Sequence, residues 1–364
     1  MQMKSIFSKW ASCQALFSAA LLVAVSWVFA SCGGHDDGDA PHDNPDTKPQ
    51  KDKPELPVSA SELQTAAFYI LSDSYYGFLE FTDAGYYIMV PYEFLYDTSE
   101  TKTRGVVMKN GKRHLNRSFS MLRHAKGTRD GEGQNSVFFG RFTQDNPGIF
   151  VMNGFGKITV KKFSDGYTLT IQEDGYDAEE VEARLLDKLP SSSELEQVCG
   201  VWTLDHVDAL FVSYTESSGG EEIFNKSYKP SEIKYFDQDL YHFLMKRYTS
   251  QVSALTEDEV LSPTSPMGEI SKVIFTDNGT FINVSRSGDA EPFFWDWENT
   301  ANGVIRWALL PEELDDNDMV SFLNLFTGDK THNNWNGLEM LEAYTYDLYG
   351  EDVDQIFDWF FKVE

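Results

Sequence analysis

Residues 81–88 read FTDAGYYI, and residues 275–282 read FTDNGTFI. The two stretches are identical at five of eight positions. In each, an Asp can bond its own backbone at a turn entrance, and a Gly can take the positive φ that lets a chain reverse. Each stretch therefore predicts a strand, an Asp-x-Gly turn and a second strand. Their places in the two halves of the chain suggest a duplication, although chance similarity between two common hairpins remains an alternative.

Further short apolar runs, bounded by turn residues, surround both copies. They lie at residues 137–142, 149–153, 157–163, 167–172, 293–297 and 304–309. Short runs at this spacing, without long helices between them, are typical of an antiparallel sandwich or barrel. The fold class expected is mainly β, with two antiparallel β-barrel or β-sandwich domains and a few short helices.

Four segments have apolar residues at helical spacing. We expect helices at residues 178–189, 193–198 and 230–245, while residues 353–361 fit either a short amphipathic helix or a closing strand. The length beyond residue 57 suits two domains rather than one. We place them at residues 58–190 and 191–364, with a helical insertion in the second.

The amino-terminal residues have the pattern of an export signal. Lys4 and Lys9 precede an apolar run, residues 15–29, which is short for a membrane span of about 20 residues. Phe29, Ala30, Ser31 and Cys32 follow. This tetrad resembles a bacterial lipobox, except that Phe29 stands where the family usually has Leu or another aliphatic residue. The resemblance implies a signal peptide at residues 1–31 and lipidation of Cys32, while an ordinary secretory signal is the alternative.

Residues 33–39 read GGHDDGD, which resembles the acidic tag of Bacteroidota-type surface lipoproteins. That resemblance implies an outer-membrane protein, lipid-anchored and exposed at the cell surface. Residues 32–57 are rich in Asp, Pro and Lys and nearly free of aliphatic residues, so they cannot bury enough apolar surface to fold. We expect this stretch to be a disordered acidic tether.

Charge and cysteine content set further limits. The formal charge is −28, and loss of Lys4 and Lys9 with the signal brings it to −30, which excludes nucleic acid as a general partner. With Cys13 removed and Cys32 acylated, Cys199 is the remaining thiol, so no internal disulfide is expected. Its apolar neighbours indicate an inert, buried side chain rather than a nucleophile.

One segment departs from the acidic composition. Residues 102–129 carry nine Lys or Arg and no Asp or Glu. These cations could bind phosphates or an acidic glycan. We favour the alternative, a hairpin whose cations complement carboxylates elsewhere on the same protein.

Residues 200–202 read GVW. Gly-x-Trp on a first strand, followed by a meander of hairpins, resembles the entry of a lipocalin-like barrel. The resemblance implies a closed or nearly closed barrel over the second half, with Trp202 at one end and an arginine from a late strand packed on it. Arg306 is the candidate for that arginine.

Signatures of catalysis are missing from the sequence. It contains no Gly-x-Ser-x-Gly, His-Glu-x-x-His, Gly-x-x-x-x-Gly-Lys or Cys-x-x-Cys motif. Its histidines lack ligand-like spacing, and the acidic group at residues 312–318 lacks the Gly and final Glu of an EF-hand. We expect no enzymatic activity, no cofactor and no metal, although a hydrolase with paired carboxylates is the third possibility.

Tryptophan is confined to the second half after removal of the signal. Trp295 and Trp297, two residues apart, share a face of a strand. Candidate ligand-binding residues are Trp202, Trp295, Trp297, Arg306 and Trp307, although core packing is the more common role of such aromatics. The function expected is binding of a small apolar molecule or a glycan, and the alternative is a structural or adhesive surface protein that contacts other proteins.

Overall fold

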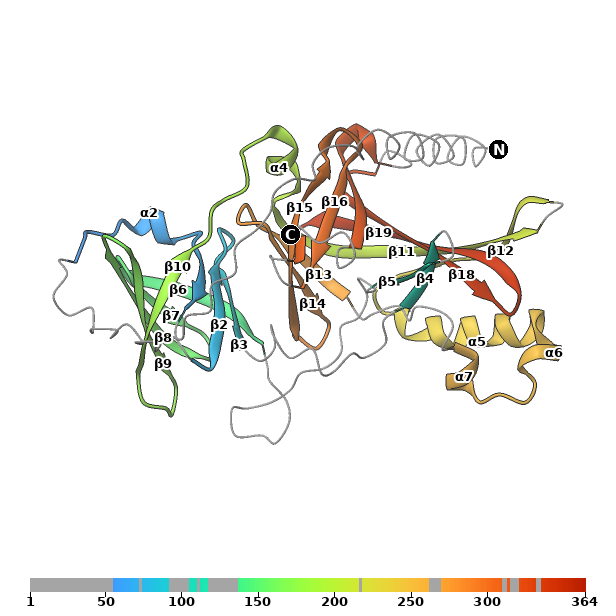
Figure 1. Cartoon of the computed structure of the whole chain (residues 1–364), viewed down its shortest axis with the longest axis horizontal. Helices are drawn as coiled ribbons and strands as arrows, with labels where there is room; N and C mark the ends of the chain where they lie inside the picture. Colours follow the sequence, from blue (N-terminus) through green and yellow to red (C-terminus); the bar gives the residue numbers. More distant parts are fainter. Residues whose placement is uncertain are drawn as a thin grey trace, which may run out of the picture. The chain divides into compact units, whose positions relative to one another are not determined.

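The computed structural model shows a mainly β protein with two closed antiparallel barrels of eight strands each, which confirms the predicted fold class (Figure 1). Of the two architectures that the sequence left open, both sheets adopt the barrel. The structure describes residues 55–71, 74–91, 105–109, 112–116, 137–215, 218–261, 270–309, 313–314, 321–331 and 335–364. Cys32 and most of the predicted tether lie outside these ranges.

The first barrel is a meander closed by pairing of its first and last strands. Around the ring the order is β1-β10-β9-β8-β7-β6-β3-β2. The strands are β1 (Ala67–Ile70), β2 (Tyr76–Phe81), β3 (Tyr86–Pro91), β6 (Phe138–Asn146), β7 (Ile149–Met152), β8 (Gly156–Phe163), β9 (Gly166–Glu173) and β10 (Glu179–Leu185), preceded by helix α2 (Ala60–Leu63). Alternate residues of each strand fill one apolar core.

The second barrel is closed by its two longest strands, β11 and β19, which pair along much of their length. Its strands are β11 (Gly200–Thr215), β13 (Ile270–Phe275), β14 (Thr280–Ser285), β15 (Ala290–Asn299), β16 (Val304–Ala308), β17 (Ser321–Thr327), β18 (Leu338–Leu348) and β19 (Glu351–Val363). Strand β12 (Ser218–Tyr228) pairs with β11 outside the ring. Short 3-10 turns η2 (Ile233–Tyr235), η3 (Thr300–Asn302) and η5 (Gly328–Lys330) complete the connections.

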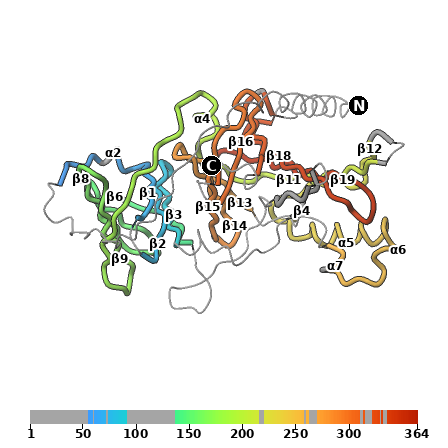
Figure 2. Tube along the Cα trace, viewed as in Figure 1, coloured from blue at the N-terminus to red at the C-terminus, as the bar shows by residue number. Residues whose placement is uncertain are grey.

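Helices close the second barrel's core from two sides. Helix α4 (Ser193–Val198) is capped by the Ser192 hydroxyl, which accepts from the N–H of Leu195 at 3.1 Å, and buries Leu195 and Val198 in the core. Helices α5 (Phe236–Arg247), α6 (Thr249–Val252) and α7 (Glu257–Leu261) follow β12 (Figure 2). Buried residues of α5 belong to the same core as β11 and β19. Among the described residues, no helix is both long and apolar enough to cross a membrane.

Of the four segments with apolar residues at helical spacing, two form helices and two form strands. Helices at residues 193–198 and within 230–245 are confirmed as α4 and as η2 with α5. The helix expected at residues 178–189 is wrong, because this segment is β10, which pairs with β1 and β9 to complete the first ring. Val181 and Ala183 are buried, and the charged residues that alternate with them, Glu180, Glu182 and Arg184, are exposed. The period is therefore two, and the apparent helical stripe had skipped Ala183. Residues 353–361, which fitted either element, lie in strand β19.

The two matching stretches form the same hairpin. Gly85 and Gly279 both have a φ of 76°, as the turn requires. The N–H groups of Thr82 and Thr276 each donate to the carbonyl four residues on, at 2.8 and 2.9 Å. One hairpin joins β2 to β3 and the other joins β13 to β14. Identical turn geometry supports a duplication, which stays a prediction.

These hairpins also meet each other at the joint between the barrels. Their outward faces share one apolar cluster, in which Ile88 and Ile282, equivalent positions of the repeat, are both fully buried. Phe78 of β2 packs edge-on against Phe294 of β15, with ring centroids 5.3 Å apart. The connection from β10 to α4 is short, since β10 ends at Leu185 and α4 begins at Ser193. The two barrels are therefore joined by a packed apolar interface.

The basic segment contains a hairpin, as expected. Strands β4 (Gly105–Lys109) and β5 (Lys112–Asn116) pair with each other in a separate two-stranded sheet, and β4 contacts β18. The other residues of the 102–129 segment lie outside the described ranges.

Candidate functional site

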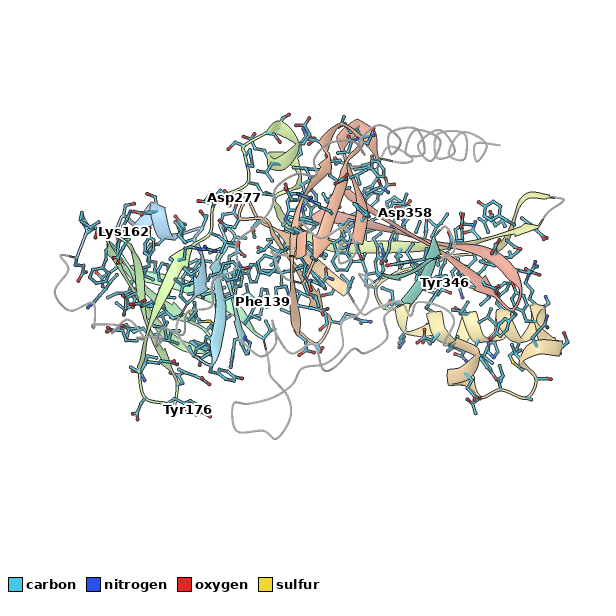
Figure 3. The ribbon with its side chains drawn as sticks, in the orientation of Figure 1. Phe139, Lys162, Tyr176, Asp277, Tyr346 and Asp358 are labelled. Carbon is cyan, nitrogen blue, oxygen red and sulfur yellow. The ribbon has the colours of Figure 1, made fainter. Side chains whose placement is uncertain are left out.

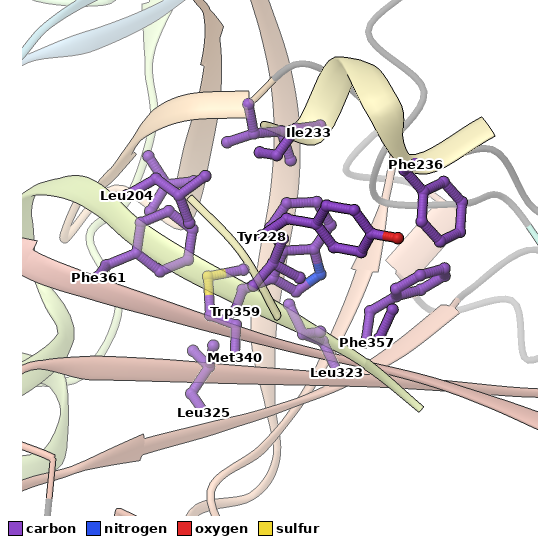
Figure 4. Packing of buried hydrophobic residues seen from close by; sticks show 14 of the residues in the cluster. Leu204, Tyr228, Ile233, Phe236, Leu323, Leu325, Met340, Phe357, Trp359 and Phe361 are labelled. Carbon is purple, nitrogen blue, oxygen red and sulfur yellow. The ribbon is translucent and has the colours of Figure 1, made fainter. Parts of the chain in front are cut away.

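The predicted site tryptophans lie in the core of the second barrel. Trp295 and Trp307 are opposite each other on β15 and β16, and each is at most 2% exposed. Trp359 of β19 is fully buried among Tyr228, Phe357 and neighbouring aliphatic residues (Figure 4). These indoles supply core area and do not form an exposed platform.

The aromatic rings of this core contact one another at short range. Trp295 and Trp297 share a face, as the sequence predicted, with ring centroids 5.4 Å apart. Phe293 meets Trp307 edge-on at 5.0 Å. Trp202 is 7% exposed beside helix α4, where its indole N–H donates to the carbonyl of Val198 at 2.8 Å. The expected position of Trp202 at one end of the barrel fits this contact with α4.

Arg306 does not join this core, so the predicted packing of Arg306 on Trp202 is wrong. Its neighbours Ile305 and Trp307 point inward, which places Arg306 on the outer face of β16. There its guanidinium lies 3.3 Å from the carboxylate of Asp296, its cross-strand partner. The departure follows from the period of two along a strand, which puts Arg306 and Trp307 on opposite faces.

Polar side chains interrupt the apolar interior of the second barrel. Four of them occupy inward positions of their strands and are at most 6% exposed: Asn283, Ser321, Glu342 and Gln355. Each is opposite a core residue of a neighbouring strand. A purely apolar small molecule would thus meet polar groups as well as packed rings in this interior.

The strongest candidate site lies on the outer face of the second barrel, around a β-bulge. Leu204 is opposite Phe361 and His206 is opposite Phe360, so Asp205 is the extra residue. A bulge breaks the alternation and redirects side chains, and bulges recur beside functional sites. Here it brings Asp205 and His206 together on one surface.

Asp205 forms ion pairs with two lysines, Lys229 and Lys362. Its carboxylate accepts hydrogen bonds from Lys362 of β19, from Lys229, at 3.0 Å, and from Nδ1 of His206, at 2.8 Å. Burial alone would raise the pKa of Asp205, but these three hydrogen bonds outweigh it, so the pKa lies well below its ordinary value. The side chain of Asp205 is 17% exposed, whereas those of Lys229 and Lys362 are 58% and 59% exposed. The carboxylate is therefore an anchor, and the ammonium groups face solvent.

Aromatic rings adjoin these lysines. The imidazole of His206 stacks on Phe360, with centroids 4.4 Å apart and planes 8° apart. The indole of Trp335 meets both rings edge-on, at 5.4 and 5.5 Å, and the ammonium of Lys362 lies 5.5 Å from its centroid. We name His206, Trp335, Phe360, Asp205, Lys229 and Lys362 together the bulge site.

Trp335, just before β18, is held in place by Phe361 of β19 and by Thr331. Its indole N–H donates to the carbonyl of Phe361 at 3.0 Å, and its own carbonyl accepts from the hydroxyl of Thr331 at 2.7 Å. Gly337 makes this approach possible, because a Cβ there would lie 2.0 Å from the Phe361 carbonyl oxygen and 2.7 Å from the indole nitrogen. The ring is half-buried and orientationally fixed.

A further lysine continues the same outer face. Thr203 of β11 is opposite both Lys272 of β13 and Lys362 of β19, so these three side chains form a row across adjacent strands. Lys272 donates to Glu364 at 2.6 Å and to the hydroxyl of Tyr86 at 3.0 Å. Cations thus extend from the bulge site towards the joint, on a chain whose formal charge is −28.

A second polar cluster on the outer face is acidic and adjoins the bulge site, since Glu339 of β18 is directly opposite Phe360. Asp358 of β19, labelled in Figure 3, is directly opposite Asp208 of β11 in the strand register. Burial, followed by the charges of Glu339 and Asp208, raises the pKa of Asp358. Strand β4 of the basic segment contacts β18, which carries Glu339. That contact is consistent with the predicted intramolecular role of the basic segment, which stays a prediction.

Neither metal nor thiol chemistry has a site among the described residues. No group of three or more His, Cys, Asp or Glu side chains there could hold a metal ion. Burial, followed by the nearby charge of Asp277, raises the pKa of Cys199 to about 12, so its thiol stays protonated at neutral pH. Of the acidic group at residues 312–318, only Glu313 and Leu314 fall in the described ranges.

Sequence reasoning missed the bulge site. Its members come from residues 205–229 and 335–362, which only barrel closure brings together. One local signal was available, since Leu204 and Val207 are apolar three positions apart inside a strand, which indicates a bulge between them. Comparison with protein-family models, curated proteins and solved structures gave no match for this chain.

Proposed function

We propose that this protein is a lipid-anchored, cell-surface protein of the outer membrane that is not an enzyme and binds a glycan at the bulge site. The anchor rests on the lipobox-like residues that end at Cys32 and on the acidic tag and tether that follow. Glycan binding rests on one observation, the fixed rings of His206 and Trp335, backed by the buried Phe360, beside two solvent-facing lysines.

The chemistry of this group suits a sugar. An aromatic side chain offers a flat apolar face with little conformational entropy to lose, and a pyranose ring offers a flat apolar face of C–H groups. Charged side chains at the rim can donate hydrogen bonds to hydroxyls. Because Trp335 is held by Phe361 and Thr331, it needs no ordering when a ring stacks on it.

The other ligand class, a small apolar molecule inside the barrel, has weaker support. The candidate residues Trp295 and Trp307, like Trp359, contact other core side chains and are nearly inaccessible. Helices α4 and α5 contribute to the same core. A ligand in this space would have to displace packed rings, so we favour the outer face.

A glycan array probed with the full-length lipidated protein in detergent tests the proposal. We expect binding to a restricted set of oligosaccharides and its loss in Trp335→Ala. The control is Phe322→Ala, which removes an aromatic residue that is 52% exposed on the outer face of the same barrel and lies outside the bulge site. Equal array signals from the wild type and Trp335→Ala, or no signal from the wild type, would exclude glycan binding at the bulge site.

A further inference from the structure

The two lysines of the bulge site share one carboxylate. Asp205 binds the ammonium of Lys362 through Oδ1 and that of Lys229 through Oδ2. A single negative charge opposes two positive charges, so the pair keeps an excess positive charge. Each ammonium group has three donors and uses one on Asp205, which leaves the others for a ligand.

The shared carboxylate also fixes the position of this excess charge. Lysine side chains normally lose considerable rotamer entropy on binding, whereas these two are already held at the two oxygens of one group. Lys362 is also placed beside the ring of Trp335, its ammonium 5.5 Å from the centroid. A ring stacked on Trp335 would carry its substituents close to Lys362.

Resting on the proposed glycan function, we infer that the bulge site selects acidic saccharides, with Lys229 and Lys362 receiving a carboxylate or sulfate of the sugar. Charge-assisted hydrogen bonds between ammonium and anion are stronger than those to neutral hydroxyls. Lys272, at the far end of the row through Thr203, is ion-paired with Glu364 and only 19% exposed, so the excess positive charge is centred on Lys229 and Lys362.

Matched pairs of ligands that differ only in charge test this selectivity. Calorimetric titrations of the full-length lipidated protein in detergent would use oligogalacturonate against its methyl ester, and chondroitin sulfate oligosaccharides against the desulfated form whose carboxylates are also methylated. We expect at least one acidic form to bind about tenfold or more tightly than its neutral partner. Affinity for the acidic form should fall as NaCl is raised from about 50 mM to about 500 mM, while affinity for the neutral form should change little.

Lysine variants test whether Lys229 and Lys362 cause the preference for acidic saccharides. Lys362→Gln and Lys229→Gln should each remove most of the preference for the acidic form, because each lowers affinity for the acidic form much more than affinity for the neutral form. Lys234→Gln is the matched control, since Lys234 is an exposed lysine of η2 whose ammonium lies over Tyr235 instead. Circular dichroism melts would verify that each variant is folded.

The outcomes separate the two claims. Equal affinity for acidic and neutral partners, or an acidic preference retained in both lysine variants, overturns the selectivity and leaves glycan binding standing. Absence of binding to all four ligands, together with a blank array, overturns the proposed function itself.

Discussion

The carboxylate of Glu80, on β2 of the first barrel, accepts a hydrogen bond from the hydroxyl of Thr280, on β14 of the second, and neither side chain is exposed. The side-chain amide of Asn278 donates to the same carboxylate at 2.7 Å. Asn278 and Thr280 both belong to the second copy of the repeated hairpin, residues 275–282. A buried polar contact therefore lies inside the apolar joint between the barrels.

Removal of this carboxylate should destabilise the protein. Glu80→Ala removes two buried hydrogen bonds, although Asn278 still donates to the Thr65 carbonyl and the Thr280 hydroxyl still contacts that of Thr276. Each lost bond to a buried carboxyl costs about 1–3 kcal/mol. We expect the free energy of unfolding, measured in urea, to fall by about 2–5 kcal/mol. Glu180→Ala, at an exposed position of β10, is the control and should change stability little. A loss no greater than that of the control would show that the contact does not stabilise the joint.

The pH dependence of stability should carry the signature of Glu80. Burial raises its pKa above the ordinary 4.5, and the hydrogen bonds from Asn278 and Thr280 oppose this only in part. The folded state then binds more protons than the unfolded state, so stability falls as pH rises above about 4.5. Glu80→Gln, which stays neutral, should lack this contribution. The difference in unfolding free energy, wild type minus Glu80→Gln, should decrease from about pH 4 to about pH 8, and a difference that increased with pH would contradict the prediction.

Asp205 should show the opposite sign. Its hydrogen bonds from Lys362, Lys229 and His206 lower its pKa below the ordinary 3.8, so it stabilises the folded state above that pH and loses this effect on acidification. Asp205→Asn should be destabilised at neutral pH and should approach the wild type below about pH 3. Asp289→Asn serves as control, because this partly buried carboxylate accepts a hydrogen bond from the hydroxyl of Ser287 in its own loop. A gap that persists unchanged at low pH would show that the anchor role of Asp205 is not electrostatic.

Two tryptophans should separate stability from binding. Trp359→Ala empties a fully buried position and should cost about 3–5 kcal/mol of unfolding free energy. Trp335→Ala removes a half-buried ring at the surface and should cost about 1–2 kcal/mol, yet abolish glycan binding. Urea titrations and the glycan array measure the two effects. If Trp335→Ala unfolded the protein as strongly as Trp359→Ala, Trp335 would be a core residue and not a binding platform.

Gly337 should be indispensable to the bulge site. In Gly337→Ala the new methyl would overlap the Phe361 carbonyl and crowd the indole of Trp335, so the start of β18 would have to shift. We expect a loss of about 1–3 kcal/mol in stability and a clear loss of glycan affinity. Asn336→Ala, at the exposed neighbouring position, should leave both unchanged. Wild-type binding by Gly337→Ala would show that Trp335 need not be held where it is.

The sequence predicted individual hairpins better than it predicted which strands pair to close the barrels. Asp-x-Gly turns and alternating strands are local features, so the repeat around Gly85 and Gly279 could be predicted with its turn geometry. The start of β11 was expected at residues 200–202, but its length was missed because the bulge at Asp205 breaks its alternation. Residues 178–189 were misassigned because spacing of four along a helix and of two along a strand coincide at Val181 and Leu185, and only pairing with β1 decides between them.

Site prediction failed for a related reason. The density of tryptophan pointed to Trp295 and Trp307, but a large aromatic in a strand is buried or exposed according to which face the neighbouring strands cover. Trp335 and His206 are far apart in the sequence and carry no motif. Their meeting depends on closure of β11 against β19, which local patterns do not encode.

Barrel closure leaves one strand of the second sheet, β12, paired on a single side. Such an edge invites pairing with another copy, and charged residues are a common defence. Glu221, Glu222 and Lys226 are exposed along β12. Lipid anchors would confine many copies to two dimensions, where collisions between neighbours are frequent. Charged side chains along β12 would then disfavour edge-to-edge strand pairing between neighbouring copies, so that the protein stays dispersed over the membrane.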